Sequence, residues 1–171
     1  MITYNPAFDL YHSIFRMAHI LLKMDEHKPV EIDRVRIWDF YMLYPVQLNH
    51  VSLKMDEKEI RDARKLLKLK ETNYDYKGDT RKLFEWIKPC QISALGCLVS
   101  CGILSKEAFE VGNVLVSNHD KLNAFVEHAG DISVHERNIL KFLSFLFSGM
   151  PLTGNYGMKH RTKLLEFKYD V

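Results

Sequence analysis

The sequence lacks the long apolar stretch that a membrane-spanning helix requires, since no apolar run reaches roughly 18 to 20 residues. It also lacks an opening in which a charged, an apolar and a small-residue segment follow one another, as in a secretion signal. Its formal net charge of +2 is too small to indicate nucleic-acid binding by itself. We therefore expect a cytoplasmic protein. Its 171 residues, 47% of them hydrophobic, suffice for one domain with a substantial core.

Cysteine is scarce, and the three residues, Cys90, Cys97 and Cys101, all lie in one predicted helix. An odd number of cysteines in one helical stretch argues against a disulfide framework. Cys97 and Cys101 are one helical turn apart and could share a metal ion, but no histidine follows at zinc-finger spacing. We interpret the cysteines as small buried apolar residues, and we predict neither a metal nor another cofactor.

The stretch from Pro89 to Ser117 organises the predicted fold. Residues 90–101 are apolar on nearly every face, which is typical of a helix inside a fold. Gly102 is suited to cap the end of this helix, and a hairpin is predicted in which 103–104 pair with 114–116. Together with a short helix expected over 80–88, this stretch is predicted to form the second half of a winged helix-turn-helix unit with a β-hairpin wing.

The central predicted helix has no arginine or lysine between Cys90 and Leu104, and Gln91 is its only long polar side chain. A helix that reads DNA needs such side chains for base edges and phosphates. We therefore favour a winged helix used as a scaffold or docking surface. Two alternatives remain, a DNA-reading helix and a core helix that merely has a hairpin beside it.

The predicted fold class is mainly α. Beside the central unit we expect helices over about 6–24, 31–44, 54–71, 120–128 and 133–147 and a final strand over 164–169. Capping boxes are predicted at Asp56–Glu59 and Ser133–Glu136. The expected organisation is a single domain, 1–171. A helical segment over 1–29 packs on a winged-helix unit of about 31–117, followed by C-terminal helices and a strand over 118–171.

Charged side chains within these helices have ordinary interpretations. Asp39 lies three residues after Arg36, so we predict an ion pair within one helix. His12 and His19 lie among apolar residues and are expected to be hydrogen-bonded packing residues. An enzyme, such as a hydrolase that uses His12 or His135, is a weaker hypothesis because no nucleophile or metal set accompanies either residue.

Two basic clusters are candidate contacts with a partner or with nucleic acid. One cluster lies at the end of the helix over 54–71. It is either a solvated helix face or a basic surface that binds phosphates or an acidic partner. The other follows the Gly154–Gly157 loop, which is not a phosphate loop because only two residues separate its glycines. The alternative for its arginine is an internal pair with Glu166 or Asp170. The candidate residues are Lys65, Lys68, Lys70, Lys159, His160 and Arg161.

Several motifs follow one another along the chain. They are Tyr4–His12 with Phe15 and Arg16, Arg36–Tyr41 with Tyr44 and Pro45, Gln91 with Ala94 and Leu95, and Gly157–Thr162 with Glu166, Tyr169 and Asp170. In this order they resemble the middle components of bacterial ABC-three-component systems, particularly middle component 5. Lys163 departs from that pattern, because a glycine is expected at its position.

This resemblance implies a winged-helix adaptor without enzymatic activity of its own. Its implied partners are an ABC ATPase of the chromosome-maintenance (SMC) type and an effector such as a nuclease, with DNA as a further partner of the assembled complex. Lamassu-type systems, which act against phages and plasmids, are the best-known example. The alternative function is a winged-helix transcriptional regulator that binds DNA.

Overall fold

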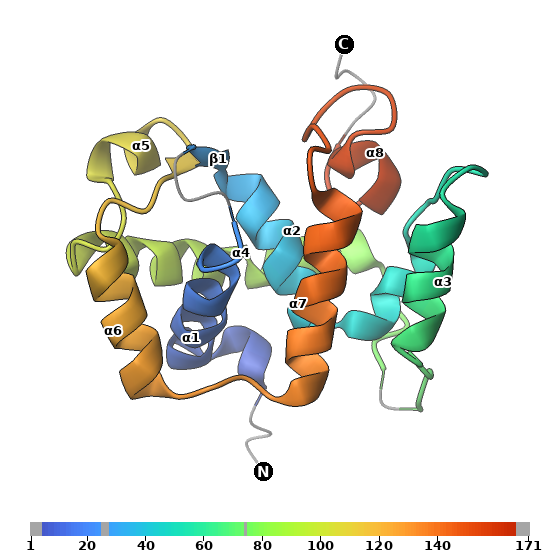
Figure 1. The fold of residues 1–171 in the computed structure, drawn as a ribbon, viewed down its shortest axis with the longest axis horizontal. Coiled ribbons are helices and arrows are strands. Elements are labelled where there is room, and N and C mark those ends of the chain that lie inside the picture. Colours follow the sequence, from blue (N-terminus) through green and yellow to red (C-terminus); the bar gives the residue numbers. More distant parts are fainter. Residues whose placement is uncertain (1–4, 25–27, 74, 167–171) are drawn as a thin grey trace.

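The computed structural model describes residues 5–24, 28–73 and 75–166, and this part of the chain is mainly helical (Figure 1). No helix in it is long and apolar enough to cross a membrane. The elements are η1 (Pro6–Phe8), α1 (Leu10–Leu21), β1 (Val30–Glu31), α2 (Ile32–Leu43), η2 (Pro45–His50), α3 (Lys58–Leu66), α4 (Thr80–Ser100), α5 (Lys106–Glu110), β2 (Asn113–Val114), α6 (His119–Ala129), α7 (Val134–Phe147) and α8 (Met158–Thr162).

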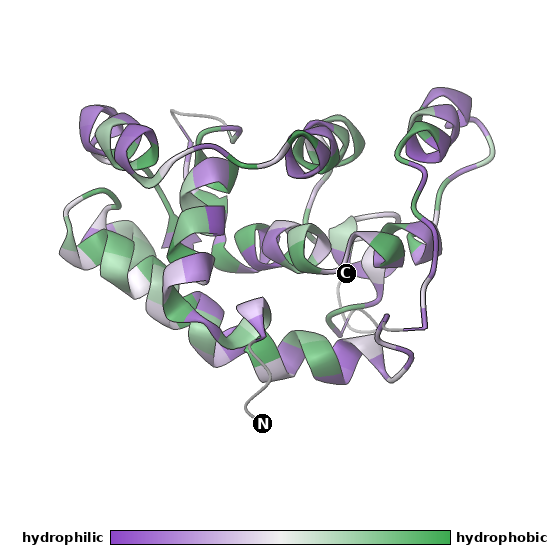
Figure 2. Ribbon diagram, turned by 90° about the horizontal axis from the view of Figure 1, so that it is seen from below, coloured by the Kyte–Doolittle hydropathy of each residue, from purple (hydrophilic) through white to green (hydrophobic). Residues whose placement is uncertain are grey.

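Three helices, α1, α2 and α4, form the centre of the fold. Helix α1 packs against α4, α2 and α6, whereas α7 covers α2 and also meets α3 (Figure 1). The buried residues belong to one hydrophobic core, in which the largest fully buried side chains include Phe40, Tyr41, Phe84 and Leu95. In contrast, α3 at the right of Figures 1 and 2 is largely hydrophilic and contains no buried residue.

Local capping explains where several helices begin. The Asp9 side chain accepts a hydrogen bond from the His12 amide at the start of α1, and Asn118 does the same for Lys121 at the start of α6. The predicted capping box at Ser133–Glu136 is confirmed at the start of α7. Helix α2 ends before Pro45, as predicted from the missing amide hydrogen of proline.

The predicted helix-turn-helix pair over 80–88 and 90–101 is wrong, because α4 continues through Pro89. Buried side chains recur at helical spacing on both sides of the proline, from Phe84 through Gln91 to Leu98. Pro89 is exposed, and so is Glu85, whose backbone carbonyl loses its helical hydrogen bond to the missing amide of the proline. Packing along the whole buried face therefore overrides the break that proline predicts.

The prediction that residues 90–101 are buried on all sides is also wrong. Only one face of this half of α4 is buried, formed by Gln91, Ala94, Leu95 and Leu98. Cys101 is exposed and Cys97 is half-buried, as is Cys90, so the cysteines are not core residues. An apolar composition on several faces thus reflects small side chains at the surface rather than complete enclosure.

The small antiparallel sheet differs from the predicted hairpin. Strand β1 pairs with β2, with Val30 opposite Val114 and Glu31 opposite Asn113. Part of the hairpin is present, since Leu104 forms an isolated bridge with Val116. Helix α5 fills the connection between the two segments, so no tight two-residue turn closes it. Val114 therefore finds its main partner 84 residues earlier in the chain, which local turn chemistry cannot predict.

Two more local predictions are wrong. The capping box at Asp56–Glu59 is absent, because α3 starts after Glu57, which has no side-chain capping bond there. The Glu57 carboxylate is engaged elsewhere, as described below. Residues 164–166 are not a strand, and the remainder of the predicted strand, 167–169, lies outside the described residues.

Candidate functional site

A buried polar network joins the three central helices. Asp39 of α2 accepts hydrogen bonds from Arg16 Nε of α1 at 2.7 Å and from Gln91 Nε2 of α4 at 2.9 Å. Arg16, Asp39 and Gln91 are each at most 3% exposed. The predicted pair between Asp39 and Arg36 is therefore wrong, because both residues have closer charged partners.

Arg36 occupies the other side of this network. Its guanidinium donates to Gln91 Oε1 at 3.1 Å and to Asp33 at 2.7 Å, and it lies 4.2 Å from the centre of the Phe84 ring. Gln91 returns a hydrogen bond to the Arg36 carbonyl oxygen. Both ends of the Gln91 amide are consequently used inside the molecule. The only long polar side chain between Cys90 and Leu104 is thus unavailable to bases.

Arg161 forms a second buried ionic contact. Its two terminal nitrogens donate to the two carboxylate oxygens of Glu57 at 2.7 and 2.8 Å, and its Nε donates to the Tyr156 carbonyl at 2.8 Å. These bonds from Arg161 lower the pKa of Glu57, although burial opposes its ionisation. The alternative in which Arg161 pairs within the protein therefore agrees with the structure, but the partner is Glu57. Glu166, one of the two partners expected, pairs with Arg81 instead. Asp170 lies outside the described residues.

The six basic candidate residues do not form one surface. Arg161 is 3% exposed and is fixed at the beginning of α3, whereas Lys65 lies in the last turn of α3, about 12 Å further along the helix. Lys65 is exposed and pairs with Asp62 at 2.9 Å. Lys68 and Lys70 are exposed but follow the end of α3.

The tail residues Lys159 and His160 belong to the short helix α8, which follows the Gly154–Gly157 loop. Both side chains are half-buried, and the His160 ring packs edge-on against Tyr156 at 5.5 Å. Gly157, which precedes α8, brings the backbone close to the Thr153 carbonyl, with which an added Cβ would collide. The glycine therefore permits the backbone to pack closely against another part of the protein itself.

The histidines considered as catalytic residues lie on different helices. His12 is exposed on α1 and His135 is exposed on α7. His19 is buried and bonds with its ring nitrogen to the Gly130 carbonyl at 3.1 Å, as expected of a packing residue. Over the described ranges, no cluster of histidine, cysteine and carboxylate side chains is arranged to hold a metal ion.

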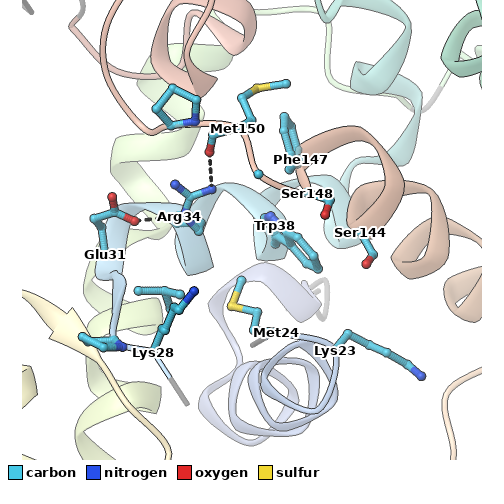
Figure 3. Close-up of a pocket in the computed structure, with 14 residues that line it drawn as sticks. Lys23, Met24, Lys28, Glu31, Arg34, Trp38, Ser144, Phe147, Ser148 and Met150 are labelled. Carbon is cyan, nitrogen blue, oxygen red and sulfur yellow. Dashed lines mark hydrogen bonds and ion pairs between the residues drawn. The ribbon is translucent and has the colours of Figure 1, made fainter. Parts of the chain in front are cut away.

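A pocket of about 490 Å³ lies between α2, the end of α7 and the segments that flank them (Figure 3). Arg34 forms one wall, and it donates to Glu31 at 2.9 Å and to the Met150 carbonyl at 2.8 Å. Burial works against ionisation of Glu31, yet the bonds from Arg34 and from its own backbone amide hold its pKa below the usual value. Trp38 and Phe147 form the apolar side of the pocket.

Sequence reasoning missed this pocket, although it contains one recognisable signal. Arg34 and Trp38 are four residues apart and therefore share one face of α2. The segment from Ser148 to Pro151 that completes the pocket has no such signal, because its position depends on the hydrogen bond from Arg34. The pocket is thus assembled by a contact over 116 residues of sequence.

Comparison with known proteins gives one family. A family model described as ABC-three component (ABC-3C) system Middle Component 5 matches residues 2–170. No curated protein and no solved structure gives a significant match to the chain.

Proposed function

The chain belongs to this middle component 5 family, and we propose that it is a non-enzymatic adaptor that bridges the other two components of its system. We propose that these are an SMC-type ABC ATPase and a nuclease-like effector, and that the complex acts in the cytoplasm against phages or plasmids, as Lamassu-type systems do. The family match over residues 2–170 supports this proposal, because a middle component of a three-component system is expected to act together with the other components.

The proposed adaptor is built on a winged-helix unit within a single domain. Along the chain, the winged-helix unit would consist of α1, β1, α2, α4, the bridge at Leu104 and β2. Helix α1 would then belong to the unit, and residues 80–100 would form one of its helices. Pairing of β1 with β2 and of Leu104 with Val116 supports this arrangement. The proposed unit differs from the expected one over about 31–117 chiefly by including α1.

An adaptor accounts for the central helix better than a transcriptional regulator does. Gln91 is committed to Arg36 and Asp39, and residues 90–104 contain no arginine or lysine. Readout of DNA in the major groove depends on side chains of those types. In the adaptor, α4 has a structural task, since its buried face and Gln91 hold α1 and α2 together.

Co-expression of the three components tests the proposed function. We expect a tagged effector to retain the ATPase only when this chain is present, because the chain supplies the contact between them. The matched control is an equal expression of the two other components with an empty vector. Association of ATPase and effector that is equally strong without the chain would contradict the bridging function.

A further inference from the structure

Another pocket, of about 310 Å³, lies where the start of α3, the end of α7 and the segment before α8 meet. Phe145 and Tyr156 line it, and these residues are 49% and 54% exposed. Met55, which follows the lining residue Lys54, is 95% exposed. Single exposed apolar residues are ordinary, whereas several of them around one hollow are typical of a surface that a partner covers. The four residues together form the α3–α7 groove.

Tyr156 presents an ordered aromatic ring to this groove. Its backbone has φ of 68°, a left-handed conformation that is strained for an aromatic residue, and such strain is concentrated at sites that hold ligands. The ring is fixed from two sides, by the edge of the His160 ring at 5.5 Å and by the Lys54 ammonium at 4.8 Å from its centre. A partner that packs on this ring therefore has little side-chain entropy to remove.

The charges in the lining are unbalanced, and the chain that carries them, residues 51–57 and 145–161, lies within the described ranges. Glu57 is the one carboxylate among the described lining residues, and both of its oxygens accept hydrogen bonds from Arg161. Arg161, and after it Lys54, lowers the pKa of Glu57, so one carboxylate serves two cations. Lys54 forms no ion pair with a residue that the structure describes, and it is exposed at the rim. An excess of one positive charge therefore remains there, which favours an anionic partner group.

We propose that the α3–α7 groove binds a peptide segment of another component of the system, in which an aromatic anchor residue lies beside a carboxylate. The anchor packs against the rings of Phe145 and Tyr156, and the carboxylate pairs with the Lys54 ammonium. This proposal rests on the adaptor function proposed above, and it assigns one surface of the adaptor to one chemical class of partner.

The charge of the groove separates this partner from two others. A second copy of the chain would bring the same surface with the same excess of positive charge, which would not be neutralised. Nucleic acid is bound by several cations along the line of its phosphates, whereas Arg161 is 3% exposed and committed to Glu57. A peptide with a carboxylate beside its anchor uses both the lysine and the two rings.

Fluorescently labelled overlapping peptides that cover the ATPase and the effector provide the probe, and the intact chain is titrated into each. We expect binding by a peptide with an aromatic residue next to Asp or Glu. Phe145→Ser should weaken this peptide by about tenfold, because the anchor loses one of its two rings. The matched control is Val134→Ser, which removes a 71% exposed apolar side chain from the same helix outside the groove and should leave affinity unchanged.

Two further variants test the other contacts. Lys54→Gln should weaken the peptide and reduce the salt dependence of binding, whereas Lys82→Gln, at an exposed lysine of α4 outside the groove, should do neither. Tyr156→Gly removes the ring and suits the left-handed backbone, so we expect weaker binding with a cooperative melting transition. This variant keeps the test decisive if Phe145→Ser fails to fold.

The proposal is overturned if no peptide binds, if the groove variants bind the peptide as tightly as their controls, or if only single-stranded DNA binds in the groove. A dimer of the chain that Phe145→Ser dissociates would also overturn it. A three-component complex that assembles normally with Phe145→Ser and Lys54→Gln would retain the adaptor function while placing its contacts elsewhere. Failure of the unaltered chain to join the ATPase and the effector would instead contradict the adaptor function.

Discussion

Arg161 illustrates how a basic residue in a glycine-flanked segment becomes structural. Its guanidinium makes a bidentate contact with Glu57, and the Arg161 carbonyl accepts the Ser52 amide hydrogen at 3.0 Å. These contacts fasten α8 to the segment that precedes α3. Since the pair is largely enclosed, loss of one partner leaves the other charge without compensation.

We predict that Arg161→Glu destabilises the protein by about 3–5 kcal/mol, because it removes the partner of half-buried Glu57 and places a second carboxylate beside it. Urea unfolding followed by circular dichroism measures the change. Arg81→Glu is the matched control, since Arg81 pairs with Glu166 at the surface and should cost less than about 1 kcal/mol. Equal effects of the two substitutions would show that Arg161 is not a structural residue.

Lys163 occupies a left-handed backbone conformation, with φ of 57°, at the end of α8. This is the position where the family resemblance led us to expect glycine, so the turn geometry is kept although the residue differs. We predict that Lys163→Gly stabilises the protein by about 0.5–1 kcal/mol, because glycine adopts this conformation without a steric penalty.

Thermal unfolding of Lys163→Gly measures this gain. The control is Lys159→Gly, in the first turn of α8, where the backbone is helical and glycine should destabilise instead. A decrease in stability for Lys163→Gly would mean that the lysine side chain contributes more than the backbone conformation costs.

At the scale of elements, α4 carries the largest difference between expectation and structure. Pro89 was expected to separate two helices, yet α4 runs through it with seven buried residues over its length. Proline in a helix interior costs about 3 kcal/mol relative to alanine. Contacts of α4 with α1 and α2 offset this cost in the folded protein.

We predict that Pro89→Ala stabilises the protein by about 1–3 kcal/mol, since it restores the helical hydrogen bond while part of the gain is lost to a freer unfolded chain. Chemical denaturation measures it. Lys88→Ala is the neighbouring control, because the pair that Lys88 makes with Glu85 is exposed and its loss should change stability little. A destabilised Pro89→Ala would indicate that the proline ring itself packs in the fold.

Elements defined by local chemistry could be predicted from the sequence. The capping box of α7 and the proline that ends α2 act within a few residues, so their effects can be read directly. The pairing of β1 with β2 and the salt bridge of Arg161 with Glu57 connect distant segments. Which distant segments meet depends on how the whole chain folds, so Glu57 could not be predicted from the sequence as the partner of Arg161.

Across the whole molecule, the resemblance motifs serve mainly internal contacts. Arg16, Asp39 and Gln91 build the network between the three central helices, and Arg161 fastens α8. The pocket beside Trp38, by contrast, is created only by the assembled fold. That the chain is one domain stays a prediction, which proteolysis of the purified protein can test.

The start of α8 is unsuited to hold a phosphate. A phosphate-binding loop offers unpaired backbone amides at the start of a helix. Here the amides of Met158 and Lys159 already donate to the carbonyls of Pro151 and Leu152, at 2.9 and 3.0 Å. The loop from Gly154 to Gly157 therefore closes on the protein itself.

We predict that the purified chain neither hydrolyses ATP nor cleaves DNA, because the amides at the start of α8 are occupied and the two histidines considered as catalytic residues, His12 and His135, lie on separate helices. Phosphate release and plasmid nicking measure the two activities, with the three-component complex as the positive control. Turnover that persists through purification and disappears in His12→Ala or His135→Ala would contradict the prediction. Activity that follows the ATPase or effector, and is unchanged by either substitution, would agree with an adaptor that organises catalysis by its partners.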